Sequence, residues 1–367
     1  MRADRRGPVS EIADGLLILG MHRSGTSAVA GALDCLGVSF GEPLMPPREG
    51  ENSRGYFEHM DFFEFHQSFL GRCAFAWDDP RRLDLGAIPS RVLGEATDEL
   101  CALLRRHFSD VTTWAVKDPR VCRLLPLWHR ALDELGAEVR HIIVLRHPDE
   151  VAASLAVRNG FSREKSDLLW ADHLLEAEAE TRNRRRAFIA YRDLLERPME
   201  CLTELAGELS MAWPRGGAGA QDAVLDFLDS GLRHHRVPER PSGVESRGRL
   251  GDLLPRLYGQ LTAEANGHQE PDLRLFDELS AQLEARRSDL HSLMIEHSTQ
   301  LSLRGVGELE ELCLPWLEQQ RKDIEELRDL VHELEHQLGE RTRWLQIQDR
   351  ILHDQVARID RLERGED

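Results

Sequence analysis

Leu16-Leu-Ile-Leu-Gly-Met-His-Arg-Ser-Gly-Thr-Ser27 opens with four apolar residues, which predict a short, fully buried strand. A glycine-bounded turn follows, and residues 27–33 then have the apolar spacing of a helix. A strand, a glycine-rich turn and a helix form a cradle for an anion, because backbone N–H groups at the helix start point at it and the helix dipole adds to the attraction. The stretch therefore predicts a phosphate-binding loop.

The loop has the glycine spacing of a Walker A motif but lacks the lysine of that motif. Gly20 and Gly25 stand at the two glycine positions, and Ser27 stands at the Ser/Thr position. Thr26 occupies the place of the lysine, which nucleotide kinases and NTPases use on their β- and γ-phosphates. A cation stands earlier in the loop instead, at Arg23. An ordinary nucleoside-triphosphate site is therefore disfavoured.

Three more segments have the composition of strands, at residues 112–116, 141–145 and 187–191, and each is followed by a helical pattern. Such strand–helix alternation is typical of one parallel, doubly wound sheet. We therefore predict an α/β fold with a P-loop-type parallel sheet flanked by helices. Ligands of open parallel sheets bind at the carboxyl ends of the strands.

Cations follow two of these predicted strands. Lys117, in Lys-Asp-Pro-Arg, follows the segment 112–116, and Arg146 follows the segment 141–145. Pro148 and the acidic residues after it predict the start of a helix, and Ser154 lies on that helix. A guanidinium gives phosphate a planar, charge-assisted grip, and a hydroxyl adds a neutral hydrogen bond.

The loop resembles the 5′-phosphosulfate-binding loop of sulfotransferases, which reads roughly Pro-Lys/Arg-Ser/Thr-Gly-Thr-Thr/Ser after a strand. In the same family an arginine that ends a strand is followed eight residues later by a serine, and both hold the 3′-phosphate of the donor. Arg146 and Ser154 have that spacing. The resemblance covers about residues 16–236 and implies that 3′-phosphoadenosine-5′-phosphosulfate (PAPS) is the donor. The implied 5′-phosphosulfate ligands are Arg23, Ser24, Gly25, Thr26 and Ser27.

The resemblance also points to residues for catalysis. Tyrosylprotein sulfotransferases carry a similar Lys-Asp-Pro after a strand, and their lysine belongs to the catalytic centre, which implies that role for Lys117. Bacterial members of the superfamily carry a segment Asn-x-x-Gly-Tyr-Phe/Trp-Glu after the first helix. Residues 52–58 read Asn-Ser-Arg-Gly-Tyr-Phe-Glu, and we predict that the terminal Glu58 is the general base.

Two other residues compete with Glu58 for the role of base. Glu42 lies at about the distance from the loop at which tyrosylprotein sulfotransferases place their catalytic glutamate. His59 is a third candidate, since cytosolic sulfotransferases use a histidine. We favour Glu58 because its segment has an aromatic pair that can anchor it, whereas Glu42 precedes Pro43 in a loop with no evident anchor.

The activity that this resemblance implies is transfer of a sulfuryl group from PAPS to a hydroxyl or amine of an unidentified acceptor. Carbohydrate, lipid, peptide and small-molecule acceptors all stay open. Arg23 and Lys117 would stabilise charge on the sulfuryl group and the departing phosphate, so we predict that no metal is required. Two other functions stay open, namely a P-loop kinase that uses Mg²⁺ and a nucleoside triphosphate, and a catalytically inactive scaffold.

The composition of the chain limits the classes of partner and the cellular compartment that we expect. The chain has 367 residues and a formal net charge of −18, which disfavours a nucleic-acid partner. Its six cysteines form no C-x-x-C pair, as expected of a reduced protein. No stretch is long and apolar enough to predict a membrane span or a signal peptide. We therefore expect a cytoplasmic protein.

The C-terminal part has a different pattern. Apolar residues recur at a strict seven-residue interval from Leu317 to Ile359, which predicts a coiled coil that joins copies of the chain or binds a protein partner. We predict a P-loop domain over residues 1–237, a linker with helical segments over residues 238–304, and the coiled-coil helix over residues 305–367.

A zinc-protease pattern also occurs in the predicted coil. Residues 332–336 read His-Glu-Leu-Glu-His, which matches H-E-x-x-H. The heptad register places both histidines off the apolar seam, and neither a third ligand nor an enclosing cavity is evident. We therefore predict no metal site there.

Overall fold

A computed structural model describes residues 12–13, 15–48, 52, 54–228, 250–267 and 272–287. The chain divides into two compact units, Met1–Ile295 and Glu296–Asp367, and every described residue belongs to the first. The predicted coiled coil and its H-E-x-x-H pattern lie outside the described residues. The predicted boundary at residue 237 lies outside them too, so the division into three regions stays a prediction.

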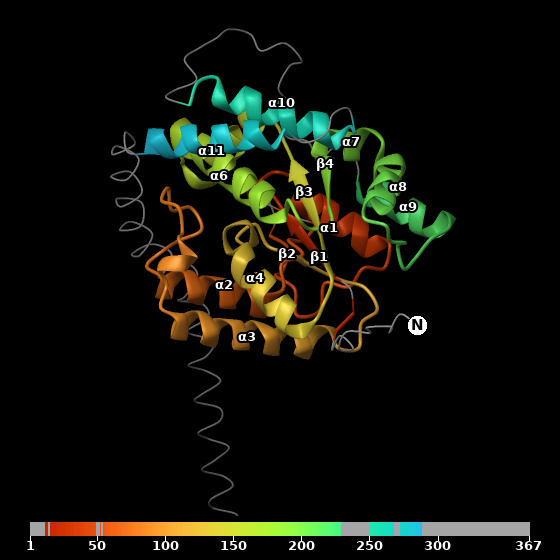
Figure 1. Ribbon diagram of the computed structural model, residues 1–367. Coiled ribbons are helices and arrows are strands. Elements are labelled where there is room, and N and C mark those ends of the chain that lie inside the picture. Colours follow the sequence, from red (N-terminus) through yellow and green to blue (C-terminus); the bar gives the residue numbers. More distant parts are fainter. Residues whose placement is uncertain are drawn as a thin grey trace, which may run out of the picture. The chain divides into compact units, whose positions relative to one another are not determined.

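Four parallel strands form one sheet in the order β2-β1-β3-β4 (Figure 1). The strands are β1 (Gly15–Leu19), β2 (Trp114–Lys117), β3 (Val139–Leu145) and β4 (Arg186–Ala190). Every residue of the four strands is buried except Arg186, the first residue of β4. Such burial is typical of a parallel sheet that is covered on both faces, whose strands are near-continuous apolar runs. The prediction of an α/β fold with a parallel sheet is confirmed.

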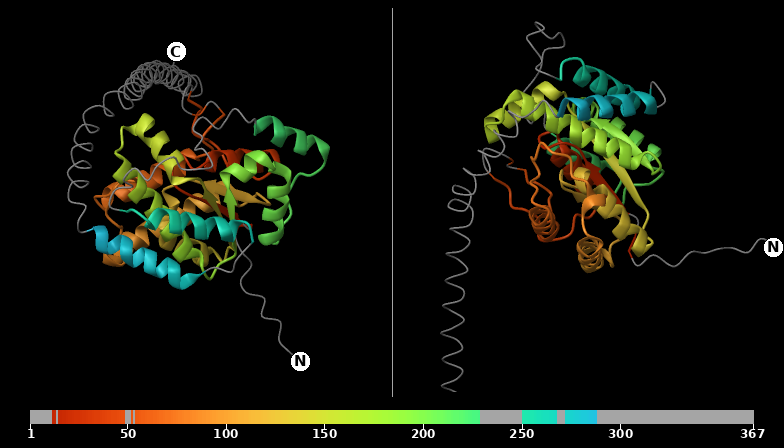
Figure 2. Two further views of the ribbon diagram at one scale, coloured as in Figure 1. Left: turned by 90° about the horizontal axis from the view of Figure 1, so that it is seen from above. Right: turned by 60° about the vertical axis from the view of Figure 1, so that its left-hand side comes forward.

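Helices cover both faces of this sheet (Figures 1 and 2). The core on one side includes residues of α1 (Thr26–Cys35), α7 (Tyr191–Glu196), α8 (Pro198–Glu208) and α9 (Ala218–Phe227), of which α9 packs on α1 and α8. The core on the other side includes residues of α2 (Met60–Arg72), α3 (Ser90–Phe108), α4 (Val121–Leu135), α5 (Pro148–Asn159), α6 (Arg163–Thr181), α10 (Leu253–Ala265) and α11 (Leu273–Arg287). A short 3-10 helix, η1 (Leu85–Ala87), precedes α3.

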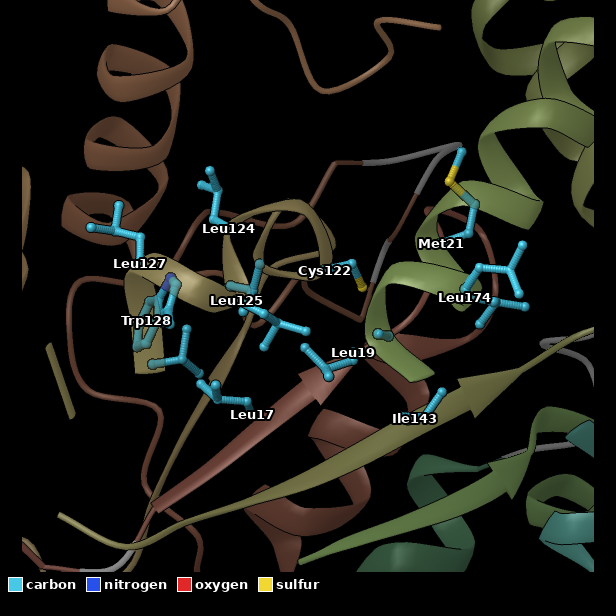
Figure 3. Packing of buried hydrophobic residues seen from close by; sticks show 14 of the residues in the cluster. Leu17, Leu19, Met21, Cys122, Leu124, Leu125, Leu127, Trp128, Ile143 and Leu174 are labelled. Atoms are coloured by element: carbon cyan, nitrogen blue, oxygen red, sulfur yellow. The ribbon is translucent and has the colours of Figure 1, made fainter. Parts of the chain in front are cut away.

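Two hydrophobic cores result from the alternation of side chains along β1. Leu16 and Ile18 belong to the core on the α1 side, whereas Leu17 and Leu19 belong to the core on the α4 side. Figure 3 shows Leu17 and Leu19 close to apolar side chains of α4, such as Trp128. Burial of one such leucine contributes about 1.5–3 kcal/mol, so the central strand is fixed from both sides.

Helices α10 and α11 share the core on the α4 side. Leu253 and Leu257 of α10 and Phe276 of α11 are fully buried within it. These two helices fall in the region predicted as linker and helical segments, and they pack on the sheet domain. No helix among the described residues is long and apolar enough to cross a membrane.

Candidate active site

The strand order places a topological switch point at the carboxyl ends of β1 and β3. The chain crosses from β1 to β2 on one side and then returns to place β3 on the other side of β1. Open α/β sheets bind ligands at such a switch point, because the loops that leave the two strands diverge there. The predicted phosphate loop leaves β1 at this point, and Arg146 directly follows β3. Topology therefore brings the two predicted donor-binding segments together.

The loop itself has a tightly constrained backbone. Arg23 and Gly25 have φ angles of 69° and 94°, in the left-handed region. A Cβ at Gly25 would lie 2.2 Å from Cδ2 of Tyr191, so both the backbone angle and the neighbouring ring require glycine. Helix α1 begins at the next residue with no side-chain cap and no acidic residue in its first turn. Its positive end is therefore available to an anion.

Arg23, Arg146 and Ser154 meet at this loop. Nε of Arg23 donates to Oγ of Ser154 at 2.8 Å, and Nη1 of Arg146 donates to the carbonyl oxygen of Arg23 at 2.9 Å. Ser154 is buried in α5, as expected if its hydroxyl serves the loop rather than solvent. The sequence spacing of eight residues thus corresponds to a real contact between the two segments.

Two further residues hold the guanidinium of Arg146. Nε of Arg146 donates to Oε2 of Glu150 at 2.8 Å, and the guanidinium lies 4.8 Å from the ring centroid of Tyr191. Sequence reasoning missed both partners. Tyr191 begins a Tyr-x-Asp-Leu-Leu turn after the fourth strand, and Glu150 stands four residues after Arg146, so each had a weak signal.

The remaining loop residues differ in their surroundings. Oγ of Ser24 is buried and has no hydrogen-bond partner among the described residues. Thr26 is buried as well. Oγ of Ser27 donates to the carbonyl oxygen of Tyr56 and accepts from Nδ2 of Asn52, both at 3.3 Å. Ser27 therefore joins the loop to the Asn52–Glu58 segment.

The Asn52–Glu58 segment places Glu58 next to Lys117. Nζ of Lys117 donates to Oε1 of Glu58 at 2.6 Å, and both side chains are buried. Lys117 stands opposite Ile18 in the sheet register, two residues before the loop begins at Gly20. Phe57 packs edge-on against Phe40 and anchors the segment. The structure thus places the predicted base and the predicted catalytic lysine in direct contact.

The two competing bases are placed differently. Glu42 is exposed. His59 is buried, and both of its ring nitrogens contact the backbone: Nε2 donates to the carbonyl oxygen of Glu42 at 2.9 Å, and Nδ1 accepts from the N–H of Asp61 at 3.1 Å. Burial, together with the nearby His107, lowers the pKa of His59. His59 thus caps α2, and of the three candidates only Glu58 contacts Lys117.

A buried hydrogen-bond network continues from Lys117 through the residue that follows it. Oδ2 of Asp118 accepts from Nδ1 of His66 at 2.8 Å and from Nη1 of Arg120 at 3.0 Å. Trp128 donates its indole N–H to Nε2 of His66. Burial alone would raise the pKa of Asp118, but the charge of Arg120 and the hydrogen bond from His66 hold it well below its usual range. Sequence reasoning missed His66 and Trp128.

Together, the fold and the site define a parallel α/β protein with a glycine-rich loop at a switch point and a buried glutamate–lysine pair beside it. No family model matches this chain, and no curated protein matches it. Among solved structures, it is similar to the sulfotransferase domain of the Synechococcus PCC 7002 olefin synthase, with 14% identity and a TM-score of 0.40 over 71% of this chain and 98% of that domain.

A second similar structure is the sulfotransferase domain from the curacin biosynthetic pathway. The identity is 14% and the TM-score 0.35, over 74% of this chain and 98% of that domain. Both likenesses are weak, so we base the function on the residues of this chain.

Proposed function

We propose that this chain is a PAPS-dependent sulfotransferase. The observation that carries the proposal is the joining of the two predicted donor-binding segments, through the contacts of Arg23 with Ser154 and of Arg146 with the Arg23 carbonyl. Two guanidinium groups and a hydroxyl at the positive end of α1 suit a ligand with anionic groups at two places. A donor with a 5′-phosphosulfate and a 3′-phosphate has that chemistry.

The loop fits the phosphosulfate end of such a donor. The buried hydroxyl of Ser24 has no partner among the described residues, so an anion oxygen would satisfy it. Gly25 keeps the backbone free of a side chain where the anion would approach. In this proposal residues 23–27 hold the 5′-phosphosulfate, and Arg146 and Ser154 hold the 3′-phosphate.

The buried pair of Glu58 and Lys117 suits the transfer step. Glu58 removes the proton from an acceptor hydroxyl or amine, whose freed lone pair forms the new bond to sulfur as the bond from sulfur to the 5′-phosphate oxygen breaks. Lys117 and Arg23 stabilise the negative charge that moves onto the departing phosphate, and burial strengthens this effect. Because these residues supply the positive charge, the proposed reaction needs no metal.

Ligand binding tests the assignment directly. We expect adenosine 3′,5′-bisphosphate to bind the full chain and to raise its melting temperature, and ATP with Mg²⁺ to have little effect. A larger shift with ATP and Mg²⁺ would favour the kinase, and no shift with either ligand would favour the inactive scaffold. A screen of acceptor classes with radiolabelled donor would then identify the acceptor.

A further inference from the structure

Three side chains of types that can ligate metals gather at one end of the pair of helices α2 and α3, which lie side by side (Figures 1 and 2). His59 caps α2, Asp61 lies in the first turn of α2, and His107 lies in the last turn of α3. One nitrogen of each imidazole and one carboxylate oxygen all lie within 4.8 Å of one another.

The contacts within this cluster are close. Nε2 of His107 lies 2.8 Å from Oδ2 of Asp61, and the ring centroids of His59 and His107 are 4.1 Å apart. Arg106 also approaches the Asp61 carboxylate, at 3.7 Å, from an exposed position. The Asp61 side chain is 31% exposed and that of His107 12%, so an ion can reach the cluster from solvent.

The donor set is that of a zinc site. Two imidazoles and one carboxylate, with a fourth position left for water, are a common ligand combination for Zn²⁺. Histidines that bind metals usually donate their other ring N–H to a carbonyl or carboxylate. His59 already does so, because its Nε2 donates to the Glu42 carbonyl, which leaves Nδ1 to face a metal. The ion would replace the 3.1 Å bond from the Asp61 N–H to Nδ1.

A second cap in the same protein shows what helix capping alone explains. His147 caps α5 with Nδ1 accepting from the N–H of Asp149 at 3.2 Å, the same His-x-Asp arrangement as at α2. There the His147 ring packs edge-on against Tyr258, and Arg163 forms an ion pair with the Asp149 carboxylate. The α2 cap instead has a second imidazole beside it, from His107. Capping therefore explains one histidine and one aspartate of the cluster, but not the other histidine.

We propose that His59, Asp61 and His107 bind a divalent transition metal, of which Zn²⁺ fits the donor set best. The ion would join the start of α2 to the end of α3. Its ligands are not residues of the proposed transfer step, so the site does not depend on the proposed function.

Calorimetric titration of the metal-free full chain with Zn²⁺ tests this site. We expect His107→Ala and Asp61→Asn each to weaken the tightest Zn²⁺ binding by at least about 100-fold, since loss of an outer partner alone costs 10- to 100-fold. Two controls should bind as the wild type does. His147→Ala removes the matching cap without a second histidine, and His336→Ala removes a histidine of the H-E-x-x-H pattern.

Equal Zn²⁺ affinity in His107→Ala and the wild type overturns the proposal, as does loss of the tightest binding in His336→Ala. Circular dichroism of each metal-free variant establishes that it folds, and Asp61→Asn decides the matter should His107→Ala fail to fold. Co²⁺ provides an independent readout, because four-coordinate Co²⁺ at this site would give intense visible absorption that both site variants lose.

Discussion

The two halves of the candidate active site are built on different principles. On the donor side, Arg23, Arg146 and Ser154 come from elements attached directly to strand ends, and Glu150 is a carboxylate partner of Arg146. On the transfer side, one cation faces one carboxylate, Lys117 and Glu58, and the carboxylate comes from a loop rather than a strand. The comparison suggests that the first half holds an anion, whereas the second half moves a proton.

Replacement of the carboxylate is the strongest test of that division. Glu58→Gln keeps the size of the side chain but cannot accept a proton, so we expect turnover to fall by at least about 100-fold while adenosine 3′,5′-bisphosphate binds normally. Single-turnover rates with radiolabelled donor and calorimetry of the bisphosphate measure the two effects.

Glu42→Gln is the matched control, because Glu42 is the other candidate carboxylate and is exposed. It should keep near-normal turnover. The substitution at Glu58 also leaves buried Lys117 without its carboxylate, so the melting temperature must be measured alongside the rate. Near-normal turnover in Glu58→Gln with collapse in Glu42→Gln would reverse the assignment.

The two arginines of the donor side should separate binding from turnover. We expect Arg146→Ala to weaken bisphosphate binding by about 10- to 100-fold, as loss of a charged hydrogen bond does. Arg23→Ala should instead lower turnover far more than affinity, because its charge is most useful as negative charge develops on the departing phosphate.

Arg140→Ala is a control for the loss of a buried arginine. Arg140 lies near the start of β3, the strand that Arg146 directly follows. Its Nε donates to the carbonyl oxygen of Leu209 and not to the loop. Its substitution should leave bisphosphate affinity unchanged. Equal affinity of Arg146→Ala and the wild type would refute the role of Arg146 in binding the 3′-phosphate.

The donor side was easier to predict from sequence than the transfer side, for a physical reason. Parallel strands that are buried on both faces give continuous apolar runs, so their ends, and with them Arg23 and Arg146, can be located along the chain. The contact of Glu58 with Lys117 depends on the path of the loop before α2. The sequence predicted roles for Glu58 and Lys117, but it could not predict that their side chains lie 2.6 Å apart.

Residues that act through packing were missed altogether. Tyr191 matters because its ring fills the space beside Gly25 and faces Arg146. The Tyr-x-Asp-Leu-Leu turn marks the residue only weakly and does not show these contacts. The capping role of His59 was missed as well, because a histidine before a helix is as compatible with catalysis as with a cap. The roles of Tyr191 and His59 depend on contacts that only the tertiary structure shows.

The smallest expected effect concerns Ser154, an uncharged residue of the donor side. Ser154→Ala removes a hydroxyl that accepts from Arg23 at 2.8 Å, so we expect bisphosphate affinity to fall about tenfold, in line with the roughly 1.5 kcal/mol lower value of a hydrogen bond to a charged group. Ser166→Ala is the control, because Ser166 is another buried serine whose hydroxyl donates within the protein, to the Ser162 carbonyl.

A double-mutant cycle with Arg23→Ala shows which way Ser154 acts. If the hydroxyl contacts the donor independently, the effects of the two substitutions on affinity should add. If it acts by holding the Arg23 guanidinium, the double variant should bind the bisphosphate no worse than Arg23→Ala alone. Because the contact is direct, we expect the cycle to be non-additive. Strict additivity would mean that Arg23 and Ser154 serve the anion separately, and the donor side would then be two sites instead of one.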